Sequence, residues 1–236
     1  MYVFQLLLFL FLACGCQDGQ RKVIRVGIDS TWYADNFGPQ TAYVNGYIND
    51  LLLEMAHYSG EEFAVVTTNW DTLTSGLGAN TYDLIFTSMP RYEHNLARYD
   101  FSQDVLDLSS YLLVPSNAKT TNVEQLQTIG ILDGDPIAII LGTYPALIMQ
   151  SYNSIPDLLN AVVSGDVQAA ALPRLPAVQY VKDLYATELK IVGKPLNSAG
   201  IHAVALKNDL GDFNQTLKAL EKKKTVDGLL NKWHLQ

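Results

Sequence analysis

The sequence predicts an α/β protein. Three observations support this class: strand-like stretches rich in β-branched residues, stretches whose apolar residues recur at helical spacing, and a regular alternation between the two along the chain. Strands and helices that alternate at this spacing are typical of βαβ units around a parallel sheet. The length of 236 residues allows either one large domain or two smaller lobes, each with its own core.

The first expected elements are a buried strand and a long helix. Residues 23–29 alternate and are rich in β-branched side chains, which predicts a strand with Asp29 at its carboxyl end. Residues 30–45 predict a loop rich in aromatic side chains. A helical pattern with one apolar stripe follows, and Ser59–Gly60 ends it.

The next strand–helix–strand unit leads into the stretch around which we expect the site. Residues 62–68 predict a strand, Trp70 opens a helix, and residues 83–87 predict a second, buried strand. Thr87 and Ser88 end that strand with hydroxyl groups, and a proline follows directly after the next residue. Polar groups therefore appear where the strand ends.

A strand at 111–115, followed by a polar stretch, marks the expected crossover to a second lobe. The chain beyond it predicts another α/β unit and two C-terminal helices. The expected helices are 123–126 and 154–164, and the expected strands are 137–141, 169–172, 189–192 and 201–206. The strand at 137–141 is expected to be buried and to lead into Thr143 and Tyr144.

Composition and charge exclude several classes of function. A hydrophobic content of 48% with 17% charged residues is typical of a folded soluble protein, and a net charge of −8 argues against nucleic acid as a partner. The histidines lack metal-ligand spacing, and the usual nucleophile, phosphate-loop and dinucleotide motifs are missing, so we expect no metal and no cofactor. Asp133 and Asp135 lack further spaced oxygen ligands and predict a turn, not a calcium site.

The first residues resemble the signal of a bacterial lipoprotein. An apolar run at 6–13, too short to span a bilayer, leads to Cys14 and Cys16, the two cysteines of the chain. In such signals a cysteine after small residues is lipidated, and either Cys16 or Cys14 fits that role. We expect a signal peptide at 1–16 and attachment to the membrane through a lipid anchor only. The alternative is a structural N-terminal strand or helix.

Polar and aromatic side chains gather where the expected strands end. They are Asp29, Trp32, Tyr33, Trp70, Thr87, Ser88, Thr143 and Tyr144. Ligands of open α/β sheets bind beyond the carboxyl ends of the strands, so this set predicts a binding cleft, which requires no nucleophile. Core packing is the alternative interpretation for the aromatic members.

Eight motifs, in this order, resemble the polar amino acid solute-binding proteins of ABC importers, the bacterial extracellular solute-binding family 3. They are 24–29 (IRVGID), 46–51 (GYINDL), 70–73 (WDTL), 82–83 (YD), 100–102 (DFS), 141–143 (LGT), 164–169 (SGDVQA) and 229–233 (LLNKW). The resemblance implies a two-lobed periplasmic binding protein type II fold with a ligand cleft between the lobes. It implies a lobe 1 formed by 22–110 and 200–236 and a lobe 2 formed by 111–199.

The resemblance also implies how an amino acid is held. Family members stack it on aromatic residues, which here match Trp32 and Trp70, and they bind its carboxylate with an arginine and its ammonium with an aspartate. This chain departs from that pattern, because the arginine position falls on Asn95, the family threonine before it on Tyr92, and the aspartate position on Pro173. An ordinary amino acid would then bind poorly unless other groups substitute, since a desolvated charge without a partner costs about 2–5 kcal/mol.

Two arginines could supply the missing carboxylate partner. Arg91 lies four residues before Asn95, one helical turn away if that segment is helical, and Arg174 follows Pro173. Either could meet a carboxylate bidentately, and the alternative for both is an ordinary solvated arginine. This interpretation predicts that Arg91→Ala abolishes ligand binding, whereas Asn95→Ala only weakens it.

These inferences predict an extracytoplasmic solute-binding protein of an ABC importer. We expect a periplasmic, lipid-anchored monomer that captures an amino acid or an amino-acid-like small solute, docks on an ABC permease and catalyses no reaction. One alternative is a lyase or dehydratase on the same fold, with Asp29 or Glu93 as its acid. Another is a binding lobe used for sensing instead of transport.

Overall fold

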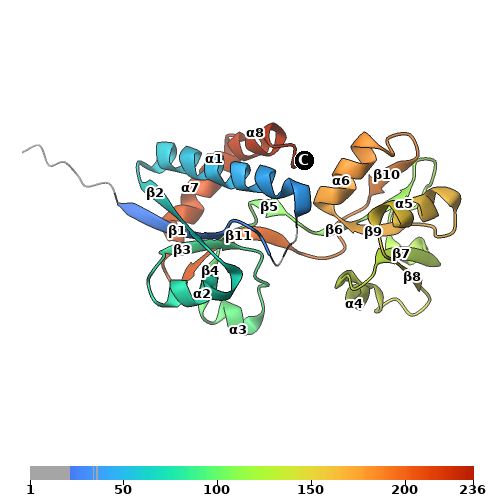
Figure 1. Cartoon of the computed structure of the whole chain (residues 1–236), viewed down its shortest axis with the longest axis horizontal. Coiled ribbons are helices and arrows are strands. Elements are labelled where there is room, and N and C mark those ends of the chain that lie inside the picture. Colours follow the sequence, from blue (N-terminus) through green and yellow to red (C-terminus); the bar gives the residue numbers. More distant parts are fainter. Residues whose placement is uncertain (1–21, 34, 36) are drawn as a thin grey trace, which may run out of the picture.

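The computed structural model describes residues 22–33, 35 and 37–236 of the chain. Its fold is α/β, with two β-sheets that follow one another along the long axis of the molecule (Figure 1). The expected signal peptide at 1–16, with its two cysteines, lies outside the described residues. No helix within the described part is both long and apolar enough to span a membrane.

The first sheet has the strand order β2-β1-β3-β11-β4, with β5 paired to β11. Its strands are β1 (Val23–Asp29), β2 (Glu62–Thr68), β3 (Leu84–Thr87), β4 (Tyr99–Phe101), β5 (Leu106–Asp107) and β11 (Gly200–Leu206). β1 runs parallel to β2 and β3, as the strand–helix alternation predicts, whereas β11 is antiparallel to β3 and β4. The carboxyl ends of β1, β2 and β3 therefore meet at one edge of this sheet.

Helices cover both faces of the first sheet. They are α1 (Thr41–Ser59), α2 (Trp70–Gly78), α7 (Gly211–Lys222) and α8 (Thr225–Lys232), with the short α3 (Glu93–Leu96) before β4. The core on one face joins α1, α7 and α8 to β1, and the smaller core on the other face joins α2 to β3 and β11. α1 ends at Gly60, whose φ of +77° is left-handed and favours glycine. α2 begins where the Asn69 side chain accepts a hydrogen bond from the Thr72 amide.

The second sheet has the strand order β10-β6-β9-β7-β8. Its strands are β6 (Ser110–Pro115), β7 (Thr128–Leu132), β8 (Ile148–Tyr152), β9 (Ala170–Pro173) and β10 (Leu189–Val192). The helices around it are α4 (Ile137–Leu141), α5 (Ile155–Ser164) and α6 (Arg174–Asp183). One core packs α4 against this sheet, and a separate core packs α5 and α6 against it. Each sheet thus has its own hydrophobic interior.

One predicted strand is wrong. Residues 137–141 form the helix α4, in which Ile137 and Leu141 are buried while Ile139 is 80% exposed. Buried residues four positions apart lie on the same face of a helix. Pro136 precedes the first turn of α4, where a backbone amide has no hydrogen-bond partner within the helix. The short apolar run could not be distinguished from a buried strand by its composition alone.

Several elements are absent from the sequence prediction: the short α3, β4 and β5 of the first sheet, and β7, β8 and α6 of the second. Gly130 interrupts the apolar run of β7, and it allows α5 to approach closely, because a Cβ there would crowd the end of the Leu158 side chain. β8 lies at the edge of its sheet and is largely exposed, so it lacks an alternating pattern. α6 carries Pro176 in its first turn, where the position needs no amide hydrogen bond.

The chain crosses between the two sheets twice, after β5 and before β11. The two crossing segments are held together, since Gly200 pairs with Asp107 and the Leu108 amide donates to the Ala199 carbonyl at 2.9 Å. The side chain of Asn197 also accepts a hydrogen bond from the Ser110 amide at 2.7 Å. These paired segments connect the two sheets at a single place.

Candidate functional site

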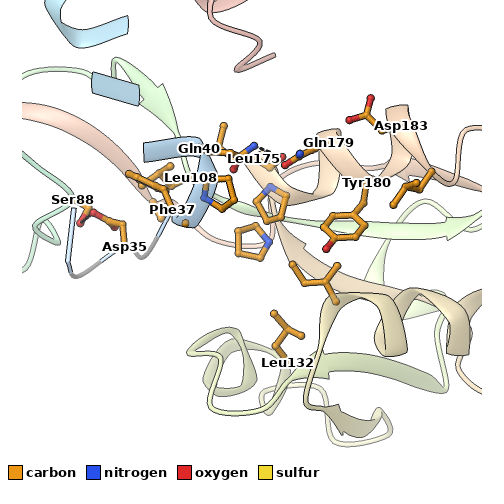
Figure 2. Close-up of a pocket in the computed structure, with 17 residues that line it drawn as sticks. Asp35, Phe37, Gln40, Ser88, Leu108, Leu132, Leu175, Gln179, Tyr180 and Asp183 are labelled. Carbon is orange, nitrogen blue, oxygen red and sulfur yellow. Dashed lines mark hydrogen bonds between the residues drawn. The ribbon is translucent and has the colours of Figure 1, made fainter. Parts of the chain in front are cut away.

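A cavity of about 800 Å³ lies between the two sheets. The chain after β1 contributes Asp35 and 37–40, and α6, with the residue that follows it, contributes the facing wall between 175 and 184. Figure 2 shows Asp35 and Ser88 on one side of this cavity and Tyr180 and Asp183 on the other. Its walls therefore come from both sheets, as expected of a cleft between two lobes.

A second hollow, too small to admit a water molecule in this structure, lies at the carboxyl ends of β1 and β3. Five predicted site residues line it together: Asp29, Trp32, Trp70, Thr87 and Ser88. Asp35 and Ser88 line both this hollow and the large cavity. The strand-end residues are thus brought together, and Ser88 is the predicted residue that also borders the large cavity.

Asp29 orders the loop after β1. Its side chain is 3% exposed, and one carboxylate oxygen accepts hydrogen bonds from the Thr31 amide at 3.0 Å and the Thr31 hydroxyl at 2.6 Å. The other oxygen accepts from the Tyr33 amide at 3.3 Å. Both oxygens are therefore engaged in a local turn, which is a common role for aspartate at the end of a strand.

The predicted aromatic residues occupy different environments. Trp32 is 3% exposed, and its indole Nε1 donates to the Asn45 side chain at 2.8 Å, so it packs in the core of the first sheet. Tyr33 is 78% exposed, while Trp70, the first residue of α2, is 40% exposed beside the small hollow. Of the two tryptophans at the strand ends, Trp70 is the one with a free ring surface.

Asp35 is a site residue that the sequence analysis missed. The Ser88 hydroxyl donates to its carboxylate at 3.0 Å. Burial raises the pKa of Asp35 above its usual value, and the hydrogen bond from Ser88 only partly opposes this effect. The loop at 30–45 was recognised for its aromatic residues, but no spacing in it distinguishes this acid from its polar neighbours.

Arg91 is already paired within its own sheet. Its guanidinium contacts the Asp104 carboxylate at 2.6 Å and donates to the Ser102 carbonyl at 2.8 Å. The condition that would align it with Asn95 is not met, because α3 begins only at Glu93. Arg91 lies outside that helix and does not share its face.

Asp104 also contacts His202, a buried residue of β11. The His202 Nδ1 lies 3.0 Å from the Asp104 carboxylate, and its Nε2 lies 2.9 Å from the Met89 carbonyl. Burial raises the pKa of Asp104, but hydrogen bonds from His202 and Arg91 outweigh it and hold that pKa below its usual value. The result is an ordered cluster of Arg91, Asp104 and His202 beside the crossing segments.

The other residues of the predicted clamp face different partners. Tyr92 is 61% exposed, and the Asn95 side chain donates to the Pro90 carbonyl at 2.9 Å. Arg174 lies 3.8 Å from Asp107, with its guanidinium 5.6 Å from the centroid of the Tyr111 ring. Both arginines that could bind a ligand carboxylate thus already have an aspartate as a neighbour.

Thr143 and Tyr144 are not brought to the large cavity. They follow α4, and the Thr143 hydroxyl donates to the Ile140 carbonyl at 2.7 Å. Tyr144 packs against the core of the second sheet and borders a separate hollow. The incorrect strand at 137–141 explains why these residues were placed at a strand end.

Among the described residues, no cluster of three or more acids, histidines or cysteines could hold a metal ion.

Comparison with known proteins places this geometry in a family. Residues 24–236 match the bacterial extracellular solute-binding proteins, family 3. A curated relative from Campylobacter jejuni, named "Probable histidine-binding protein", is 29% identical over 120 residues, which is 51% of this chain and 44% of the relative. The chain therefore spans less than half the length of that relative.

Solved structures with low sequence identity share the fold. The L-cystine solute receptor of Neisseria gonorrhoeae, in its unliganded open conformation, gives a TM-score of 0.72 at 14% identity over 91% of this chain and 93% of the receptor. An ancestral cationic amino acid solute-binding protein gives 0.63 at 21% identity over 91% of this chain and 96% of its own. With its two sheets and the match over 24–236, the chain belongs to the bacterial extracellular solute-binding proteins of family 3.

Proposed function

We propose that the protein is the solute-binding component of an ABC importer and captures an amino acid or an amino-acid-like small solute between two lobes. Lobe 1 is formed by 22–110 and 200–236, and lobe 2 by 111–199. The observation that carries the proposal is the cavity of about 800 Å³, whose walls come from both sheets. Because the described chain passes between the two sheets at the paired crossing segments, rotation there would close the cavity over a solute.

The ligand contacts we propose are those that border the cavity and the adjoining hollow. Ser88 and Asp35 supply polar groups, and Trp70 supplies a ring on which part of a solute could stack. Trp32 is buried and therefore offers no ring surface to a solute. We keep Arg91 as the group to test for carboxylate binding, although its guanidinium pairs with Asp104 in this structure and would have to leave that partner.

The location and partner also belong to this proposal. A periplasmic protein with its signal at 1–16, lipidated on Cys16 or Cys14, would be held near its permease by the anchor. We propose that the chain acts as a monomer without a cofactor and catalyses no reaction. The engagement of both Asp29 oxygens by the loop backbone supports a binding role over an acid catalyst.

A binding screen tests the proposal. The purified protein is titrated with free amino acids, their decarboxylated amines and short peptides, using thermal denaturation and calorimetry. One chemical class should raise the unfolding temperature, because a ligand at about 100 times its Kd stabilises the folded state by about 2.7 kcal/mol. Absence of any response, together with no small solute in the purified protein by mass spectrometry, would reject the proposal.

Tryptophan fluorescence gives an independent reading of the same event. Trp70 is the half-exposed tryptophan beside the site, whereas Trp32 is buried in the core. Ligand binding should change the emission of the parent protein, and Trp70→Phe should remove most of that change while leaving the fold intact. An unchanged signal in this variant would place the ligand elsewhere.

A further inference from the structure

We propose that the cleft takes a small organic cation with an apolar body and no free carboxylate, for which a primary amine is the simplest example. Asp35 would hold the cationic group, and the apolar walls would hold the body. This inference rests on the proposed function and narrows its ligand class. Such a ligand differs from an α-amino acid, whose carboxylate and ammonium each require an oppositely charged partner in the site.

The charged groups around the cavity are all acidic. Among the described residues that line it, the ionisable carboxylates are Asp35 and Asp183, and no lysine, arginine or histidine is present. Figure 2 places these two acids at opposite sides of the cavity, with apolar side chains between them. A field of one sign favours a cation and opposes an anion in a site that excludes water.

Asp35 is suited to bind a cation. Its described side-chain partner is the neutral Ser88 hydroxyl, which donates one hydrogen bond at 3.0 Å. A single neutral donor compensates a half-buried carboxylate poorly. Burial, together with the charge of Asp29, raises the pKa of Asp35, and Ser88 and His202 only partly oppose this effect. An ammonium in the cavity would provide a charge-assisted hydrogen bond to this oxygen pair.

The remaining walls suit an apolar body. Phe37 and Leu108 approach from the side of the first sheet, and Leu132, Leu175 and Tyr180 face them from the second. The apolar carbons of a ligand that leave water here contribute favourably to binding, because their hydrophobic surface becomes buried. Gln40 and Gln179 are the neutral polar groups left at this surface.

A ligand carboxylate would lack a ready partner. Arg91 is bound to Asp104 and to the Ser102 carbonyl, and Arg174 is near Asp107. Neither arginine lines the cavity. An unpaired carboxylate would weaken binding by about 30-fold or more, the equivalent of the usual penalty for a desolvated charge.

Matched probes with one apolar skeleton test the charge class. Leucine, 3-methylbutylamine and 4-methylpentanoate form one series, and phenylalanine, 2-phenylethylamine and 3-phenylpropanoate form a second. Arginine and agmatine make a third pair, which separates a cationic amino acid from a cation without a carboxylate. Calorimetry should show that in any series that binds, the amine is at least about 10-fold tighter than the amino acid.

The outcomes separate this inference from the proposed function. If an amino acid or a simple carboxylate binds as tightly as its matched amine, the inference is rejected while solute capture stands. If no amine, amino acid or peptide binds, the proposed function is rejected and this inference with it.

Variants locate the cationic group. Asp35→Asn keeps the shape and should weaken amine binding by about 30-fold, because the ligand charge loses its partner. Glu188→Gln removes the same charge from an exposed turn directly before β10, outside the cavity, and should leave affinity unchanged. Circular dichroism would verify that both variants fold. Equal affinity of Asp35→Asn and the parent protein would overturn the assignment.

Discussion

At the scale of single residues, the acids of this protein differ in whether their charge helps the fold. Asp104 is compensated by His202 and Arg91, so its carboxylate form is favoured. Asp35 has less compensation, so burial disfavours its charged form. A residue that costs stability while it lines a cavity is typical of a site kept for binding.

Replacing Asp35 should therefore stabilise the unliganded protein. Because its folded-state pKa is raised, the charge costs nothing at low pH, where the acid is protonated in both states, and the cost accumulates as pH rises past the unfolded value near 3.8. Asp35→Asn should unfold at a higher temperature than the parent at pH 7, and the difference should shrink toward pH 4. Thermal denaturation at both pH values checks this, and a lower unfolding temperature at pH 7 would contradict it.

Replacing Arg91 should have the opposite effect on stability from replacing Asp35. Asp104 has a depressed pKa, so its contribution to stability is present above the unfolded value near 3.8 and is lost as pH falls through the lower folded value. Arg91→Ala should reduce the free energy of unfolding by about 1–3 kcal/mol at neutral pH, because a partly buried charge loses a partner. Urea denaturation should show a smaller loss at pH 3.

Binding by the Arg91→Ala variant also decides between two hypotheses. If this arginine clamps a carboxylate, as the sequence analysis predicts, the variant should lose ligand binding altogether. If the ligand is an amine held by Asp35, the variant should lose stability but keep affinity within about threefold, a change below 1 kcal/mol. Calorimetry on the folded variant distinguishes the two.

At the scale of elements, close packing of α1 on α8 depends on one glycine. A Cβ at Gly46 of α1 would lie 2.3 Å from the Trp233 ring, whereas nothing lies within 4 Å of a Cβ at Gly228 in α8. Gly46→Ala should thus lower the free energy of unfolding by about 1–3 kcal/mol through overpacking. Gly228→Ala should raise it by about 0.5–1 kcal/mol, because alanine is the better helix former. Chemical denaturation of both variants measures this, and equal effects would contradict the packing.

The sequence predicted those elements whose pattern and ends are local. β1 and β2 carry β-branched residues, and the helices ending at Gly60 and Gly165 stop at glycines in left-handed conformation. Elements defined by tertiary contacts were not predicted. β7 contains a glycine that its packing against α5 and β8 explains, and α4 is too short for its period to show.

The candidate site was predicted in part for the same reason. Asp29, Thr87 and Ser88 end parallel strands, so their proximity follows from the sheet. The position of Asp35 depends on the path of a loop, and the pairing of Arg91 depends on β4 and β11 folding beside it. Neither the loop path nor this pairing has a signal in the local sequence.

At the scale of the whole molecule, ligand binding should change the shape. The cavity is bordered by both sheets, and the contact between the Gln40 side chain and the Leu175 carbonyl, at 3.5 Å, spans it weakly. Closure around a solute should reduce the radius of gyration, which solution X-ray scattering measures with and without the tightest ligand of the screen. Asp35→Asn at the same ligand concentration should keep the larger radius. A radius that is unchanged in the parent protein at saturation would argue against closure.

The pairing of the two crossing segments has a consequence for how this chain could be rebuilt. The Ser110 amide and the Asn197 side chain are hydrogen bonded at 2.7 Å. The chain therefore enters and leaves the second sheet at neighbouring points. A segment with adjacent ends can be exchanged as one cassette, as tolerated domain insertions show. Grafting residues 111–196 of a relative onto this chain would then transfer half of a binding cleft while leaving Asp35 and Ser88 in place.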